Sequence, residues 1–69
     1  MSHKGYRYEY PLVSESPHAI AREIDIVGTA FQNAGWIEVD LVPESGLPTH
    51  IIFEWQQDRI PFYPSILFP

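Results

Sequence analysis

The three histidines, His3, His18 and His50, are the side chains best suited to bind a metal, because neutral imidazole is the commonest metal ligand in proteins. Their spacing does not match a metal site, since no two of them are four residues apart or joined by a short loop. Cysteine is absent from the sequence, which excludes thiolate ligands, thiolate nucleophiles and disulfide bonds. We therefore expect no metal site and three histidines that face the solvent.

Groups that could catalyse a reaction also lack partners. Four serines lie in expected loops or at a helix start, where no adjacent base is indicated: Ser14, Ser16, Ser45 and Ser65. Glu38 and Asp40 alternate on an expected strand and could form a carboxylate pair for acid–base catalysis, but we favour a solvated strand face. The sequence thus predicts a protein that has no catalytic residues, is not an enzyme and needs no cofactor.

Aromatic residues could form a platform on which the bases of single-stranded nucleic acid stack. They are Tyr6, Tyr8, Tyr10, Trp36 and Trp55. Such platforms need a positive groove, whereas this chain carries nine acidic residues against four Lys and Arg, for a net charge of -5. We therefore expect neither nucleic acid nor a membrane as a direct partner, and we assign the rings to core and interface packing.

The elements that would position these side chains begin with a strand over residues 6–13. The three tyrosines Tyr6, Tyr8 and Tyr10 alternate there with charged residues, and Pro11 restricts the strand to a short length or a sheet edge. Residues 36–42 alternate again. We expect one face of this strand to carry Ile37, Val39 and Leu41 and the other face to carry Glu38 and Asp40. A loop over residues 43–48 joins this strand to a third over residues 49–57, which completes a β-hairpin.

Between the first two strands, apolar residues recur in steps of four, three, four and three, which predicts one stripe along a helix. The stripe is Ile20, Ile24, Val27, Phe31 and Ala34. Ser16 and Pro17 are typical of a helix start, and Gly35 is typical of a left-handed residue at a helix end. Gly28 lies inside the helix, where we expect a neighbouring backbone to approach closely.

These elements predict an α+β fold of order β-α-β-β, with one helix packed on one face of a three-stranded sheet. The other face would be left open, and we expect Ile52 and some of the tyrosines to lie on it. We assign residues 1–58 to a single domain and residues 59–69 to an extended apolar C-terminal tail. Pro61, Pro64 and Pro69 rule out a regular helix or central strand in this tail.

The segment from Ala30 to Val39, followed by Val42-Pro43, Gly46, Thr49 and Ile52-Phe53, resembles a group of small uncharacterised bacterial and phage domains. These share a tyrosine-rich strand, a helix ending in "LN..GW", a strand reading "ELV.V.P" and a closing strand. The resemblance covers residues 6–55 and implies the fold without implying an activity. A weaker resemblance is to dodecin, in which an aromatic residue at the position of Trp36 stacks on a flavin.

Function is expected to lie in protein–protein contact. The apolar tail should leave water by docking on the open sheet face of its own subunit or of a neighbour, or on a different protein. Its candidate interaction residues are Ile60, Phe62, Tyr63, Ile66, Leu67 and Phe68. A chain of 69 residues buries little surface alone, so we expect a homo-oligomer. Because no signal-like apolar run is seen, we expect a cytoplasmic location.

Two alternatives to this self-associating module stay open. One is an oligomer that binds a flavin-like ligand through Trp36. The other is an acidic phage-type inhibitor that occupies the basic site of a nucleic-acid-handling enzyme by mimicking phosphates.

Overall fold

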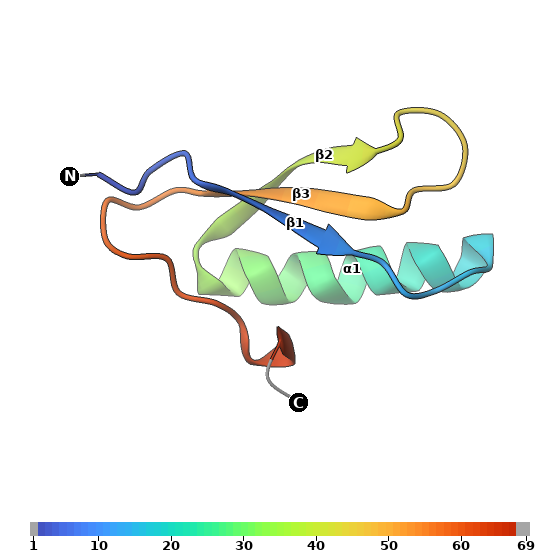
Figure 1. Ribbon diagram of the computed structural model, residues 1–69. Helices are drawn as coiled ribbons and strands as arrows, with labels where there is room; N and C mark the ends of the chain where they lie inside the picture. The colour runs from blue at the N-terminus through green and yellow to red at the C-terminus, as the bar shows by residue number, and fades with distance from the viewer. Residues whose placement is uncertain (1, 68–69) are drawn as a thin grey trace.

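The secondary structure follows the predicted order in the computed structural model, which describes residues 2–67 (Figure 1). The elements are β1 (Arg7–Pro11), α1 (Pro17–Ala34), β2 (Trp36–Val42), β3 (His50–Trp55) and a short 3-10 turn, η1 (Ser65–Leu67). Helix α1 lies across one face of the three-stranded antiparallel sheet. The predicted α+β fold of order β-α-β-β is therefore confirmed.

Helix α1 begins and ends at the predicted residues. The side chain of Ser16 accepts a hydrogen bond from the backbone N–H of Ala19 at 3.2 Å, and Pro17 occupies the first turn. Gly35 ends the helix with a left-handed φ of 112°. The apolar stripe faces the sheet: Ile20, Val27 and Phe31 are buried, and Ile24 and Ala34 are partly buried.

Strand β3 lies at the centre of the sheet, because the strand order is β1-β3-β2. Tyr8 and Tyr10 of β1 are paired with Phe53 and Ile51 of β3, whose side chains are buried under α1. The tyrosines therefore face the helix, and our prediction that some of them lie on the open face is wrong for these two. Residue Ile52 points the other way and lies half-buried on the open face, as predicted.

A β-bulge in β2 changes the predicted distribution of its side chains. The register with β3 shifts between Glu38, which is paired with Phe53, and Asp40, which is paired with Ile52. Residues that face each other in an antiparallel pair share a face, so Glu38 is on the helix side and Asp40 on the open side. The predicted strict alternation over residues 36–42 is wrong, because one extra residue reverses the pattern midway.

The core is built from aromatic rings between α1 and the sheet. Phe31 is stacked on Phe53 with ring centres 4.0 Å apart, and Trp36 lies against Trp55 at 5.2 Å. The buried members of this core are Val27, Phe31, Trp36, Ile51, Phe53 and Trp55. The expectation that Phe31 and Trp36 are buried between helix and sheet is confirmed.

Candidate interaction surfaces

The C-terminal tail folds back onto the helix side of the molecule and is held there by both tryptophans. The indole N–H of Trp55 donates to the carbonyl oxygen of Arg59 at 2.8 Å, and that of Trp36 donates to the carbonyl oxygen of Phe62 at 2.8 Å. Each indole has a single polar atom, and a buried N–H without a partner is unfavourable. The two hydrogen bonds therefore give both buried indole N–H groups an acceptor and fix the tail backbone at two points three residues apart.

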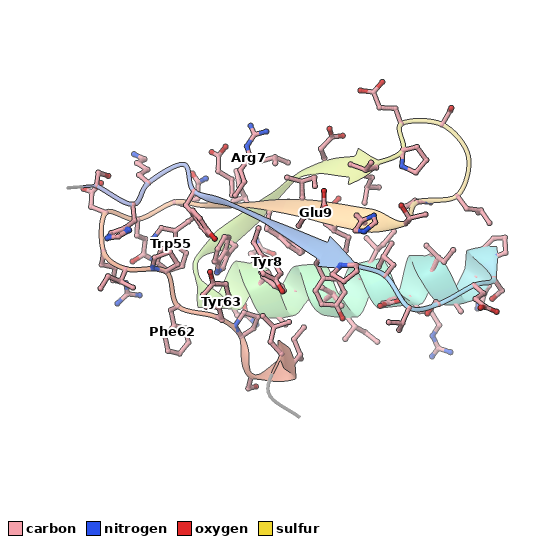
Figure 2. The ribbon with its side chains drawn as sticks, in the orientation of Figure 1. Arg7, Tyr8, Glu9, Trp55, Phe62 and Tyr63 are labelled. Atoms are coloured by element: carbon pink, nitrogen blue, oxygen red, sulfur yellow. The ribbon has the colours of Figure 1, made fainter. Side chains whose placement is uncertain are left out.

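The anchored tail has two faces. Tyr63 and Leu67 pack against the hydrophobic core, and Pro64 is buried. Ile60 and Phe62 are 74% and 64% exposed, and Ile66 is 39% exposed. Figure 2 shows Phe62 pointing away from the body of the molecule, opposite to Tyr63. We call Ile60, Phe62 and Ile66 the tail face.

The described part of the tail, residues 59–67, does not cover the open sheet face of its own subunit, so our prediction is wrong for these residues. The two indole N–H groups that bond to the tail, and the tyrosines that pack with it, lie on the helix side of the sheet. Of the six predicted interaction residues, three form the tail face, Tyr63 and Leu67 are used within the chain, and Phe68 lies outside the described residues.

Tyr63 is enclosed by other rings. Its ring centre lies 5.5 Å from that of Tyr8 and 5.4 Å from that of Trp36. Burial, then hydrogen bonding with Tyr6, then the nearby hydroxyls of Tyr6 and Tyr8, raise the pKa of Tyr63 above its ordinary value of 10.0. Because the pKa of Tyr63 is higher in the folded state than in the unfolded state, neutral Tyr63 contributes to the free energy of unfolding. This contribution is complete below the unfolded pKa and is lost as the pH rises through the folded pKa. The tail is therefore docked with a neutral Tyr63.

Trp36 has no ring face on which a flavin could stack. Its side chain is 1% exposed and is surrounded by the rings of Tyr6, Tyr8, Phe31, Trp55 and Tyr63. Its N–H is also bonded to the carbonyl oxygen of Phe62 in the tail. The position that the dodecin resemblance assigned to a cofactor is filled by the chain itself.

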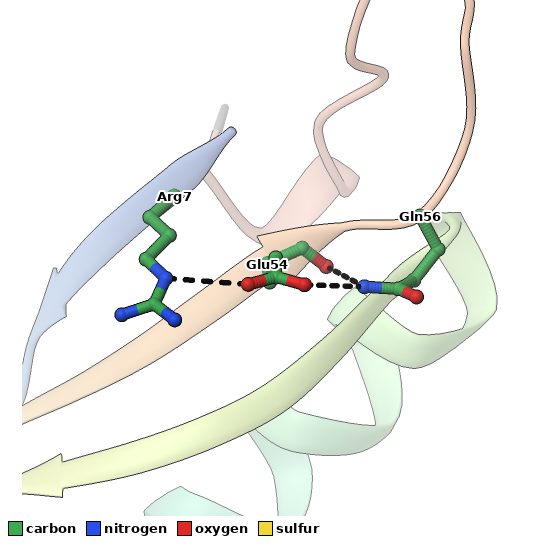
Figure 3. A network of polar contacts seen from close by, with 3 residues as sticks. All are labelled: Arg7, Glu54 and Gln56. Carbon is green, nitrogen blue, oxygen red and sulfur yellow. Dashed lines mark hydrogen bonds and ion pairs between the residues drawn. The ribbon is translucent and has the colours of Figure 1, made fainter. Parts of the chain in front are cut away.

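The open sheet face carries a polar network rather than an uninterrupted apolar surface. Arg7 Nε donates to Glu54 Oε2 at 3.3 Å, and Gln56 Nε2 donates to Glu54 Oε1 at 3.2 Å (Figure 3). His50 Nε2 lies 4.0 Å from Glu9 Oε1 further along the same two strands. Such exposed pairs add about 0–1 kcal/mol each to stability. They make the β1 and β3 part of this face polar.

A groove of about 400 Å³ runs between α1 and β2. Its lining residues are Ala21, Ile24, Asp25, Gly28, Thr29, Gln32, Ile37 and Glu38. We call this the β2 groove. Our prediction that a backbone approaches Gly28 is wrong, because the nearest atom to an added Cβ would be the side-chain Oε1 of Glu38 at 3.5 Å. Sequence reasoning did not identify this groove, although the unexplained glycine was a signal for it.

The remaining candidate groups are not brought together. The bulge places Glu38 and Asp40 on opposite faces of the sheet, and Asp40 Oδ1 accepts the N–H of Leu41 at 2.8 Å. No three His, Asp or Glu side chains of residues 2–67 lie close enough together to hold a metal ion. Within that range, no helix has the length and apolar character to cross a membrane.

Comparisons of this chain with protein-family models, with curated proteins and with solved structures found no match.

Proposed function

We propose that this protein is a small non-enzymatic protein–protein interaction module that self-associates through the tail face. The observation that carries the proposal is that two buried indoles and Tyr63 hold the tail in place while Ile60 and Phe62 stay mostly in water. An exposed apolar group is unfavourable by itself, and contact with another protein would remove it from water.

The anchored backbone favours binding in a second way. A flexible segment loses conformational entropy when it binds, at about 1–2 kcal/mol for each residue ordered. The bonds to Arg59 and Phe62 order this segment before any partner arrives. The tail face is therefore preorganised, which lowers the entropic cost of association.

Charge supports a second copy of the chain as the partner of this surface. Residues 60–69 contain no charged side chain, whereas the whole chain has a net charge of -5. Two copies that meet through their tail faces bring the uncharged part of the molecule together and keep the acidic residues apart. Because the tail face consists of three side chains, its contact should bury less than the about 800 Å² per partner that is typical of stable complexes. We therefore expect a weak dimer.

The test measures mass by light scattering over a range of protein concentrations. The double variant Ile60→Asn, Phe62→Asn should reduce dimerisation while leaving the melting temperature close to that of the parent, because both side chains lie outside the core. Val13→Ser is the matched control, since Val13 is apolar and 81% exposed but lies far from the tail in the sequence. A parent that stays monomeric, or a double variant that associates as the parent does, would contradict the proposal.

A further inference from the structure

The two long sides of the helix–sheet sandwich differ in how far other parts of the chain cover them. On the β1 side, Tyr8 and Tyr10 pack against the core, and so do Tyr63 and Leu67 of the tail, with the ring of Tyr63 5.5 Å from that of Tyr8. On the β2 side, no described segment of the chain fills the β2 groove. The described residues therefore cover the β1 side of the sandwich and leave the groove on the β2 side unfilled.

Gly28 keeps this groove open. Glycine inside a helix is less favourable than alanine by about 1 kcal/mol. No close contact among the described residues requires a glycine at this position, because an added Cβ would make only an ordinary contact with Glu38 Oε1 at 3.5 Å. The groove has an apolar part formed by Ala21 and Ile24, and Asp25 and Glu38 also line it.

Strand β2 borders the groove and is an edge strand of the sheet. The backbone N–H and C=O groups on its outer edge have no partner strand among the described residues. Exposed edges are usually protected by lysine, proline or a bulge. Residues 36–42 contain neither lysine nor proline, and the bulge begins only after Glu38. The stretch 36–38, next to the groove, is thus free to pair with an extended segment.

The charges at this site select the kind of segment that fits. Residues 23–58 contain no Lys or Arg. Their acidic residues are Glu23, Asp25, Glu38, Asp40, Glu44, Glu54 and Asp58. The two that line the groove, Asp25 and Glu38, form no ion pair within residues 2–67. A second copy that docked through the same groove would bring these carboxylates against its own, whereas a basic segment would neutralise them.

We propose that the β2 groove and the adjoining edge of β2 bind an extended basic segment of another protein. The backbone of the segment pairs with residues 36–38, as in other cases of strand addition to a sheet edge. The aliphatic part of a lysine or arginine lies over Ile24 and Gly28, and its charged end reaches Asp25 and Glu38. This surface is separate from the tail face, so the two proposals can fail independently.

The probe is a peptide of about eight alternating lysine and valine residues, long enough to pair with one strand. Its binding to the full chain is followed by NMR of the backbone amides. We expect shifts in residues 36–38 and on the groove side of α1, and we expect affinity to fall as salt is added. The same peptide with glutamate in place of lysine should not bind. Two further peptides carry N-methyl groups on alternate backbone nitrogens, one on the odd positions and one on the even positions. Only the peptide whose methylated nitrogens would donate to β2 should lose binding.

Matched variants assign the binding to the groove. Asp25→Asn with Glu38→Gln should weaken binding by about three- to tenfold, the range expected for two exposed ion pairs. Glu15→Gln with Glu44→Gln removes the same charge from exposed acidic residues outside the groove and should have little effect.

Gly28→Leu tests the groove without removing charge. It should preserve the helix, since leucine is a better helix former, and it should weaken binding by filling the groove. Peptide-induced shifts at the tail face instead of β2, equal affinity of the two double variants, or equal binding of the glutamate peptide would overturn the proposal. Self-association measured by light scattering is a separate result and tests only the tail face.

Discussion

Phe31→Ala should remove a large part of the stability of this protein. Phe31 has no exposed surface and lies within ring–ring distance of Phe53, Tyr8 and Trp36, at 4.0, 5.7 and 5.7 Å between ring centres. Truncating a buried phenylalanine to alanine costs about 3–5 kcal/mol. At about 0.05–0.15 kcal/mol per residue, a domain of 69 residues has a total of roughly 3–10 kcal/mol to lose.

The free energy of unfolding is measured by urea denaturation followed by far-UV circular dichroism, which reports on α1. Phe31→Leu, which keeps most of the volume, should cost about 1–2 kcal/mol and stays measurable if the alanine variant does not fold. Ile26→Ala is the control on the same helix, because Ile26 is 62% exposed and its loss should change stability by about 0.5 kcal/mol or less. If Phe31→Ala lost less than about 1 kcal/mol, the packing of α1 described above would be refuted.

Two further predictions concern backbone and charge. Gly35→Ala should lower the melting temperature clearly more than Gly5→Ala, because both glycines have a positive φ but only at Gly35 would the added Cβ lie 2.9 Å from Trp55. Equal losses would show that strain and not the clash decides. Burial acts to raise the pKa of Glu23, but hydrogen bonds from Ser14 and Val13 lower it by more, so its net pKa lies below the ordinary 4.5. Its stabilisation is therefore present above that value and is lost as the pH falls through the folded pKa, so the advantage over Glu23→Gln in melting temperature should shrink in acid. A gap that stays constant with pH would contradict this assignment.

The helix could be predicted from the sequence because its signals are local and agree with one another. Ser16, the spacing of the apolar stripe and Gly35 all act within a few residues, and each is found in its predicted role. The faces of β2 could not be predicted, because a bulge depends on how β3 pairs with it and leaves no mark in the alternation of residues 36–42. A single extra residue after Glu38 was enough to place Glu38 and Asp40 on opposite faces of the sheet.

The position of the tail could not be predicted for a related reason. Hydrophobicity indicated that the tail, residues 59–69, would dock on an apolar surface, but the hydrophobic effect has no direction and fits any such surface. The direction comes from two indole N–H groups that reach the edge of the core and need acceptors there. The β2 groove was missed because most of its lining residues are small or polar and come from two elements, and only Gly28 marked it in the sequence.

The central place of β3 has a consequence for the order in which this chain can fold. Both other strands pair only with β3, the last of the three in the chain, and the Arg7–Glu54 contact joins residues 47 positions apart. Until β3 is available, β1 and β2 have no partner and the helix has no sheet to pack on. The β2–β3 hairpin closes a short loop, whereas adding β1 closes a long one at a greater entropic cost. We therefore expect pairing to proceed from the C-terminal hairpin toward the N-terminus, with the addition of β1 as the slower step.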